Sequence, residues 1–414
     1  MLAVMRWDSL RLDSSDGHDH EHGTGEAAGG YTALPLIERG AVARTIDTPE
    51  FRGMTFYEVQ AKSIVSEVPK SSRMMFRYTI NPYRGCSHAC SYCFARSTHT
   101  YLDLDAGRDF DTKVVVKVNA PQLLRAKLAS PTWRGEHIAM GTNVDCYQRA
   151  EGRYRLMRGI IGALRDARNP FSILTKGTLI LRDLDLLLSA AEVTDVGLNV
   201  SAAFTDESLW RAIEPGTPAP ARRLEACAAL NDAGLPCGVL MGPVVPYLSD
   251  SPAQLAAAVR GAAEAGARHV TPIVLHLRPG AREWFLGWLR EAHPELVPRY
   301  AELYGPGAYA RKDYQARIAG QVRELAEQFG VGRDAARRGR AIPRGQAAPG
   351  NQAPPPSPAA PRDESAPRDE PGQRDQAAPR YQAALRDQSA PDNRVQPVRP
   401  APPGGASHQQ LTLL

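Results

Sequence analysis

The sequence predicts an α/β protein with a parallel sheet and the architecture of a partial (β/α)6 barrel. From about residue 33 to residue 331, short apolar runs rich in β-branched residues alternate with longer segments of helical periodicity. This alternation is typical of parallel strands joined by crossover helices. Six such units are found, which are too few to close a barrel of eight strands.

The predicted elements follow one another in a regular order. Strands are expected at residues 75–80, 137–141, 171–175, 196–201, 238–244 and 270–277. Helices are expected between them, at residues 121–129, 154–167, 184–191, 220–233 and 252–265. In the second of these helices Leu156, Ile160, Ile161 and Leu164 fall on one face, as in a helix that packs on a sheet. Functional residues are expected in the loops after the strands, because parallel barrels carry their sites at that rim.

The chain divides into four predicted segments. Residues 1–32 are polar and glycine-rich, and residues 332–414 are rich in Pro, Ala, Gln and Arg. Both contain too little apolar surface to offset the entropy of ordering, so they are predicted to be disordered tails. Residues 33–74 are predicted to form an N-terminal extension that packs on the core, and residues 75–331 the barrel itself.

The composition excludes several classes of protein. Six cysteines in 414 residues do not make a disulfide scaffold. No apolar run approaches the length of a membrane span, and the N-terminus lacks the apolar core of a signal peptide. We therefore expect a cytoplasmic protein. The net charge of +5 is spread along the chain, which is compatible with nucleic-acid contact but is weak evidence for it.

The most informative feature is a group of three cysteines, Cys86, Cys90 and Cys93, with the spacing C-x3-C-x2-C. Three thiols this close cannot all pair as disulfides, but they can converge on one metal centre. Iron–sulfur clusters are normally held by four cysteines, so a cluster bound by this loop would keep one iron open. The alternative is a zinc site completed by His88 or His99, since zinc favours four nitrogen or sulfur ligands.

This spacing, with the aromatic residue Tyr92 before the third cysteine, resembles the signature of the radical S-adenosylmethionine (radical SAM) enzymes. The resemblance implies that Cys86, Cys90 and Cys93 bind a [4Fe-4S] cluster whose open iron chelates the amino and carboxylate groups of SAM. It also implies that one electron, from a low-potential donor of the flavodoxin or ferredoxin type, cleaves SAM into methionine and a 5′-deoxyadenosyl radical. The partial barrel is the core that the resemblance implies.

Polar residues in the later rim loops are candidates for binding SAM, together with Tyr92. Asn143 and Asp145 follow the second strand. Asp145 is equally suited to capping the helix from Gly152 onward, and Glu151 is expected to act as a cap of that helix. Lys176 follows the third strand and is either a partner of the SAM carboxylate or a solvated surface lysine.

Two further candidates follow the fourth strand. Ser201 is suited to a hydrogen bond with the cofactor. Arg223 is either a bidentate partner of the SAM carboxylate or part of the exposed face of its helix.

The block from about residue 75 to 280 looks like the spore photoproduct lyase-like branch of this superfamily. The features that carry the likeness are the run Asn-Pro-Tyr-Arg-Gly-Cys at 81–86, the segment Asn-x-Asp-x-Tyr-Gln at 143–148, and Glu214-Pro215 followed by Arg223. Photoproduct lyases place a hydrogen-donating cysteine at the end of the second strand. Here Thr142 takes about that place, and Cys146 is the only nearby thiol, so it is either a shifted hydrogen donor or a small loop residue.

Two classes of function remain open from the sequence. The first is a radical SAM enzyme of lyase- or oxidoreductase-like type, with an unknown substrate for which nucleic acid is the best expectation. The second is a non-catalytic protein that binds zinc or an iron–sulfur cluster and acts in nucleic-acid binding or as a redox sensor. The colour of the purified protein separates zinc from iron, and product analysis separates an enzyme from a sensor.

Overall fold

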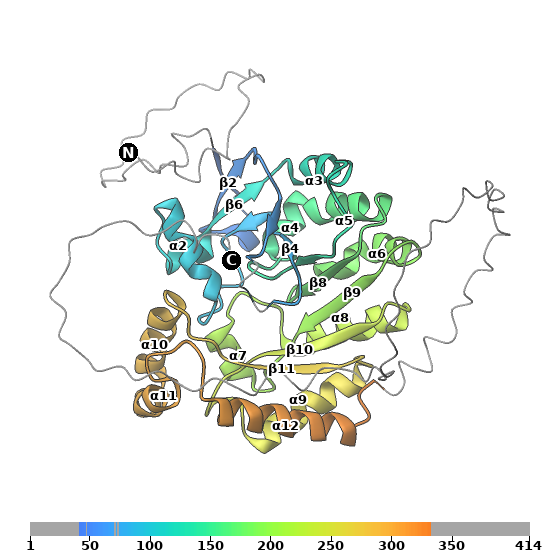
Figure 1. The fold of residues 1–414 in the computed structure, drawn as a ribbon. Helices are drawn as coiled ribbons and strands as arrows, with labels where there is room; N and C mark the ends of the chain where they lie inside the picture. Colours follow the sequence, from blue (N-terminus) through green and yellow to red (C-terminus); the bar gives the residue numbers. More distant parts are fainter. Residues whose placement is uncertain (1–40, 47, 70–71, 73, 333–414) are drawn as a thin grey trace, which may run out of the picture. The chain divides into compact units, whose positions relative to one another are not determined.

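The six predicted strands form one parallel sheet in the computed structural model, which describes residues 41–46, 48–69, 72 and 74–332 (Figure 1). They are β4 (Tyr78–Ile80), β7 (Ile138–Met140), β8 (Phe171–Thr175), β9 (Val196–Ser201), β10 (Cys237–Val244) and β11 (Val270–Val274). These strands lie side by side in that order, and all neighbouring pairs are parallel. The predicted partial barrel is therefore confirmed. The predicted tails lie outside the described residues, apart from Gly332.

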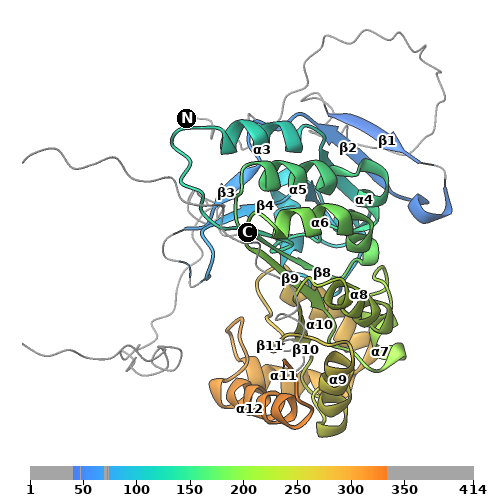
Figure 2. The same ribbon diagram turned by 90° about the vertical axis from the view of Figure 1, so that its right-hand side faces the viewer.

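Helices cover the outer face of this sheet. They are α3 (Ala120–Leu128), α5 (Leu156–Asp166), α6 (Leu184–Ala191), α8 (Pro220–Asp232) and α9 (Pro252–Glu264). Figure 2 shows them one below another in front of the strands. Phe171, Ile173 and Thr175, at alternate positions of β8, are buried, as expected for a strand between a helix layer and the barrel interior.

One predicted helix is interrupted. The expected helix at 154–167 is split into α4 (Arg149–Tyr154) and α5, because Arg155 between them has a left-handed backbone with φ of +51°. Leu156, Ile160 and Leu164 are nevertheless buried on one face of α5, as the periodicity predicts. The helical period was read correctly, but it carries no signal for the break.

The segment before the barrel contributes strands to two sheets. β3 (Val65–Glu67) pairs antiparallel with β4 and extends the barrel sheet to seven strands. A second sheet of four strands has the order β1 (Val42–Thr45), β2 (Thr55–Val59), β6 (Lys113–Lys117) and β5 (Tyr83–Arg84). The sequence did not predict this sheet. It lies between two apolar clusters, because Val114 and Val116 of β6 join the barrel core while Val115 faces a smaller group around Tyr57 and Leu104.

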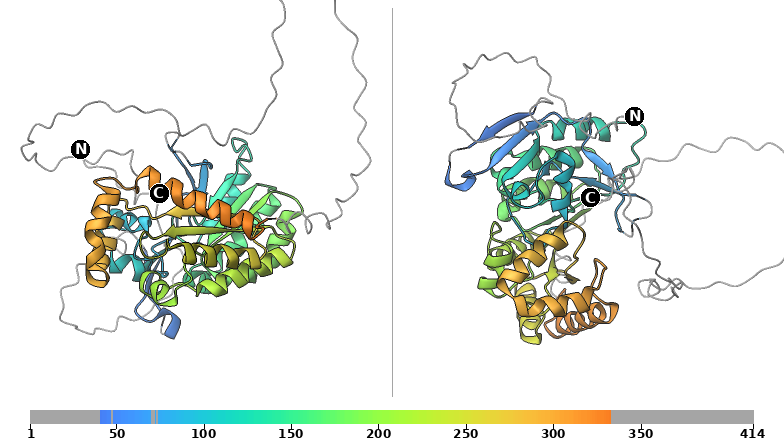
Figure 3. Two further views of the ribbon diagram at one scale, coloured as in Figure 1. Left: turned by 90° about the horizontal axis from the view of Figure 1, so that it is seen from below. Right: turned by 90° about the vertical axis from the view of Figure 1, so that its left-hand side faces the viewer.

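Helices after β11 complete the described fold. They are α10 (Ala281–Ala292), α11 (Val297–Tyr304) and α12 (Lys312–Gln328), none of which the sequence predicted. α12 packs on β11 and α9, and Figure 3 (left) shows it beside them. α10 packs instead on η3 (Phe94–Thr98), the short 3-10 helix that follows the cysteines. Figure 3 (right) shows this orange helix beside the cyan segment.

The remaining elements are short. They are α2 (Arg108–Thr112), α7 (Glu207–Ile213), and the 3-10 helices η2 (Pro49–Phe51), η4 (Thr100–Leu102), η5 (Thr178–Asp183) and η6 (Pro294–Leu296). Asp206 caps α7 by accepting hydrogen bonds from the backbone of Ser208 and Leu209. Among the described residues, no helix combines the length and the apolar character needed to cross a bilayer.

Candidate metal and cofactor site

The three cysteines lie at the rim where the sequence analysis expected the site. They follow β4 and β5, at the edge of the sheet where the parallel strands end. Cys86 and Cys90 are buried and Cys93 is half-buried. All three are free thiols, as are the other three cysteines of the chain, all of which the structure describes.

Neighbouring loops hold the backbone of the cysteine loop (residues 85–93). The side chain of Gln148 accepts a hydrogen bond from Ser87 N and donates one to Gly85 O, each 2.9 Å long. Gly216 N donates to His88 O at 3.1 Å. A Cβ at position 216 would lie 2.0 Å from Ser87 O, so only glycine permits this approach. The loop conformation is thus fixed by groups that follow β7 and β9.

A buried arginine supports the loop from its other side. Arg96 is fully buried, and its Nε and Nη2 donate to Cys90 O at 3.1 and 2.9 Å. Its Nη2 also pairs with Asp111 at 2.8 Å. The guanidinium carbon lies 5.2 Å from the ring centre of Phe110 and 4.9 Å from that of Trp284. These contacts join the cysteine loop to α2 and α10.

An ionic network joins Tyr92, which lies between the second and third cysteines, to the loop after β9. The hydroxyl of Tyr92 donates to Glu214, which is buried. The second carboxylate oxygen of Glu214 accepts from Arg223 Nη2 at 2.5 Å, and Lys176 Nζ lies 3.8 Å from the first. Burial alone would raise the pKa of Glu214, but the charges of Arg223 and Lys176 outweigh it and hold that pKa below its ordinary value. Glu214 is therefore ionised and paired.

Asp145 ties the cysteine loop to the ends of β7 and β8. Its carboxylate accepts hydrogen bonds from Thr175 Oγ1 and Lys176 N, both at 2.6 Å, and from Tyr147 N at 2.8 Å. His88 Nδ1 lies 3.4 Å from the same carboxylate. Asp145 does not cap α4, because the N-cap of that helix is Gln148 and its side chain makes no capping bond. The capping alternative for Asp145 is wrong.

Glu151 does cap a helix, but it is the following one. Its carboxylate accepts from the backbone N–H groups of Leu156 and Met157, at the start of α5. It also accepts from Tyr83 Oη at 2.5 Å and pairs with Arg182 at 2.6 Å. A structural role for Glu151 is thus confirmed, and it also anchors the strand that leads into the cysteine loop.

The other predicted SAM-binding residues differ in their burial and in the hydrogen bonds that they already make within the protein. Ser201 donates its hydroxyl proton to Gly242 O at 3.0 Å. Arg223 is fully buried and donates to Glu214, Pro218 O and Ser201 O, so the alternative of an exposed helix face is wrong. The Lys176 side chain is only 17% exposed, which contradicts a solvated surface lysine.

Three buried side-chain oxygen atoms of the rim loops have no hydrogen-bond partner among the residues that the structure describes. They are Asn81 Oδ1, after β4; Ser91 Oγ, in the cysteine loop; and Asn143 Oδ1, after β7. Buried polar atoms are normally paired, and each unpaired one needs an explanation. Asn143 is a predicted SAM-binding residue, and its free acceptor suits the N–H groups of an amino group.

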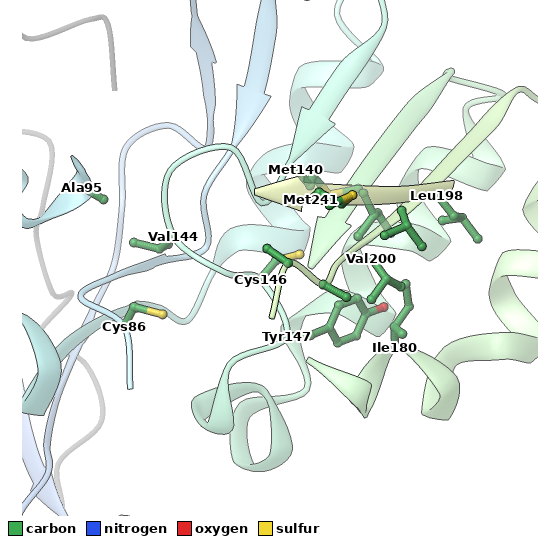
Figure 4. Close-up of a cluster of buried hydrophobic side chains, with 14 of the residues drawn as sticks. Cys86, Ala95, Met140, Val144, Cys146, Tyr147, Ile180, Leu198, Val200 and Met241 are labelled. Carbon is green, nitrogen blue, oxygen red and sulfur yellow. The ribbon is translucent and has the colours of Figure 1, made fainter. Parts of the chain in front are cut away.

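Cys146 is fully buried within the apolar core (Figure 4). Figure 4 shows it among Met140, Tyr147 and Met241, with Cys86 and Val144 to one side. Burial raises the pKa of Cys146 well above its ordinary value, and the nearby carboxylates of Asp145 and Glu151 add to this rise. Cys146 is therefore a neutral thiol.

Among the described residues, the zinc alternative finds no fourth ligand beside the three cysteines. His88 lies against Asp145, and His99 Nε2 lies 2.9 Å from Lys113 O, to which it donates. Within the described part of the chain, no group of three or more His, Cys, Asp or Glu side chains is arranged to hold a metal ion. In a cluster each thiolate binds a different iron, so the three sulfur atoms need not meet at one ion.

The sequence analysis missed three residues that organise this site. Gln148 and Arg96 bind the backbone of the cysteine loop, and Glu214 joins Tyr92 to Lys176 and Arg223. Gln148 and Glu214 entered the sequence analysis only as parts of the polar runs that carry the family likeness, without a partner. The partner of Glu214, Tyr92, is 122 residues away in sequence, so no spacing rule connects the two.

Comparison with known proteins places this geometry in context. The family model of the radical SAM superfamily matches residues 80–259. An uncharacterised protein of Mycobacterium tuberculosis is 50% identical over 302 residues, which are 73% of this chain and 89% of that protein. An uncharacterised protein of Methanocaldococcus jannaschii is 33% identical over 174 residues, which are 42% of this chain and 62% of that one.

Among solved structures, a spore photoproduct lyase complexed with dinucleoside spore photoproduct is similar to this chain, with a TM-score of 0.49 and 16% identity. The match covers 64% of this chain and 79% of the lyase chain. A methylornithine synthase matches at a TM-score of 0.32 and 13% identity, over 48% of this chain and 52% of its own.

Proposed function

We propose that this chain, which belongs to the radical SAM superfamily and is therefore a radical SAM enzyme, binds a [4Fe-4S] cluster through Cys86, Cys90 and Cys93. Members of this superfamily typically use that cluster and SAM, and they need a reductant. The observation that carries the proposal is the fixed cysteine loop. It presents three thiols at the carboxyl edge of the sheet, and hydrogen bonds from two other rim loops hold it there.

The residues present fit a cluster of this kind. Burial raises the pKa of all three thiols, and at Cys86 the charges of Asp145, Cys90 and Cys93 raise it further. Three thiolates in this loop are therefore unfavourable unless cations bind them, and iron provides that charge. The unpaired oxygens of Ser91 and Asn143 suit a bound polar ligand near the loop.

When bound, a cluster with three protein thiolates supplies an open iron for SAM and the electron that cleaves its carbon–sulfur bond. Asn143 Oδ1 would accept a hydrogen bond from the SAM amino group. Lys176 would pair with the SAM carboxylate, because its 3.8 Å contact with Glu214 leaves most of its donor capacity unused.

The other predicted cofactor residues support the cysteine loop, Lys176 and the neighbouring strand ends rather than contact SAM themselves. The Tyr92 hydroxyl holds the stretch between Cys90 and Cys93 against Glu214, and Arg223 keeps that carboxylate ionised. Asp145 places Lys176 by binding its backbone N–H. Ser201 holds the C-terminal part of β10 through a hydrogen bond to Gly242 O. Cys146 is buried on the core side, where it is retained as the candidate hydrogen donor.

The finer expectations extend this proposal. The substrate class that we propose is nucleic acid, and the electron donor a flavodoxin or ferredoxin in the cytoplasm. Their support is the net charge of +5 and the sequence features of the photoproduct lyase-like branch. A reducing compartment such as the cytoplasm is compatible with six unpaired cysteines.

The test is the formation of 5′-deoxyadenosine by anaerobically reconstituted protein given SAM and dithionite. The parent should form the nucleoside and bind iron and sulfide, and Cys90→Ala should do neither. Cys227→Ala is a matched control, because Cys227 is buried in α8, outside the cysteine loop, and should leave both readouts intact. A parent that carries a full cluster but forms no nucleoside would refute the proposed activity.

A further inference from the structure

Four side chains form an aromatic and cationic platform at the rim. Arg278 and His276 come from the loop after β11, Tyr309 from the loop before α12, and Phe94 from η3. His276 and Tyr309 form an isolated antiparallel bridge, and their ring centres are 4.6 Å apart with the planes at 66°. The Arg278 guanidinium carbon lies 5.6 Å from the ring centre of Phe94, and its Nη2 donates to Tyr309 Oη at 3.3 Å.

This platform adjoins the cysteine loop directly. Phe94 is the residue after Cys93, and it begins η3. Two residues beyond Arg278, the backbone at Gly280 passes so close to η3 that a Cβ there would lie 3.1 Å from Ser97 Cβ. α10 starts at the next residue and packs on η3. A molecule bound on the platform therefore lies beside the proposed cluster site.

The guanidinium of Arg278 is available to pair with an anionic ligand, whereas two other arginines of the rim are already paired with carboxylates. Within the described ranges the Arg278 side chain forms no ion pair with a carboxylate, and the one hydrogen bond of its guanidinium is the 3.3 Å contact with Tyr309. By contrast, Arg96 and Arg223 are fully buried and paired with carboxylates. Tyr309 is 48% exposed although its ring already contacts His276. An unpaired guanidinium between aromatic rings is suited to an anionic group attached to a planar ring.

We infer that this platform binds a nucleotide unit of a single-stranded nucleic acid, with the base stacked on Tyr309 and the phosphate paired with Arg278. Stacking of bases on exposed aromatic rings next to basic side chains is how single strands are held without sequence readout. The inference deepens the proposed function, on which it rests, because it assigns a substrate class to the surface beside the proposed radical site.

The test is the binding of a fluorescein-labelled deoxythymidine decamer to reconstituted protein, measured by anaerobic fluorescence anisotropy over a range of salt concentrations. Tyr309→Ala should weaken binding at least about fivefold, while Tyr309→Phe, which keeps the ring, should stay near the parent. Arg278→Ala should weaken binding and make the slope of log K against log salt shallower by about 0.7. Iron content and thermal midpoint are measured for every variant, so that misfolding is recognised.

Matched controls are Tyr101→Ala and Arg290→Ala, which remove an exposed ring and an exposed guanidinium outside the platform. Both should bind the decamer like the parent. Equal losses in controls and platform variants, or no binding by the parent, would overturn the inference. Formation of 5′-deoxyadenosine by the same preparations separates the two proposals. If the protein forms the nucleoside but does not bind the decamer, only the platform inference is refuted. If it binds the decamer in a way that depends on Tyr309 but forms no nucleoside, only the proposed activity is refuted.

Discussion

Replacement of Glu214 by glutamine tests the ionic network that joins the cysteine loop to the barrel. The side chain of Glu214 is 1% exposed and that of Arg223 is fully buried, and they are 2.5 Å apart. Removal of one charge from a buried pair costs about 3–5 kcal/mol, because the other charge is left uncompensated. Since glutamine keeps one acceptor oxygen, we expect a loss near the lower end, about 3 kcal/mol.

Urea unfolding of the iron-free chain under reducing anaerobic conditions measures this loss as a shift of the midpoint at an unchanged slope. The matched control is Glu207→Gln in the neighbouring helix α7. Its pair with Arg211 is similarly short, but both side chains are about 70% exposed, so the expected loss is below about 0.5 kcal/mol. Adding Arg223→Met to Glu214→Gln should recover part of the loss, because the uncompensated cation is then gone. Equal losses for Glu214→Gln and Glu207→Gln would refute the reasoning.

Three further variants probe separate features. Gly141→Ala should destabilise the fold by about 3 kcal/mol or more in thermal unfolding, because φ is +76° and the new Cβ would lie 1.8 Å from Leu174 O. Its control is Gly53→Ala, which has the same φ but open space around the new Cβ and should cost only about 1 kcal/mol. Asn143→Ala should weaken SAM binding about tenfold in anaerobic calorimetry and leave iron content unchanged; unaltered affinity would contradict its assignment. Cys146→Ala should still form 5′-deoxyadenosine with intact iron content, because a donor to the substrate radical acts after SAM is cleaved; a nucleoside yield that falls would contradict this role.

The barrel was predictable because its signal is local. The apolar runs at 171–175 and 196–201 coincide with β8 and β9, and the helix at 184–191 coincides with α6. A buried parallel strand is predominantly apolar along its length, so its sequence reveals it without knowledge of its neighbours. The spacing of Cys86, Cys90 and Cys93 is also local, and it located the candidate site.

The second sheet was not predictable in the same way. β5 is only two residues long, inside the run that leads into the cysteines, and it exists because Tyr83 and Arg84 pair with Val116 and Val115 of β6. β6 itself, the run Lys-Val-Val-Val-Lys, carries a strand signal that the sequence analysis overlooked. Short strands of this kind are fixed by their partners, and single-sequence patterns do not identify the partner.

Side-chain partnerships at the rim depended on the tertiary fold. Arg223 was expected to face the cofactor or solvent, yet it is buried against Glu214, nine residues before it. The loop after β9 brings the two together through the turn at 214–219, which no periodicity describes. Sequence reasoning thus placed polar groups at the right edge of the sheet but did not assign which of them contact one another.

Electron paramagnetic resonance of the reconstituted and reduced chain, with and without SAM, tests the central claim most directly. We expect about four irons per chain and a cluster signal that changes on addition of SAM, because the three cysteines leave one iron open. Cys86→Ala should lose this signal, whereas Cys237→Ala, which removes a buried thiol of β10, should keep both the signal and its change. A signal in the parent that SAM does not alter would contradict the account.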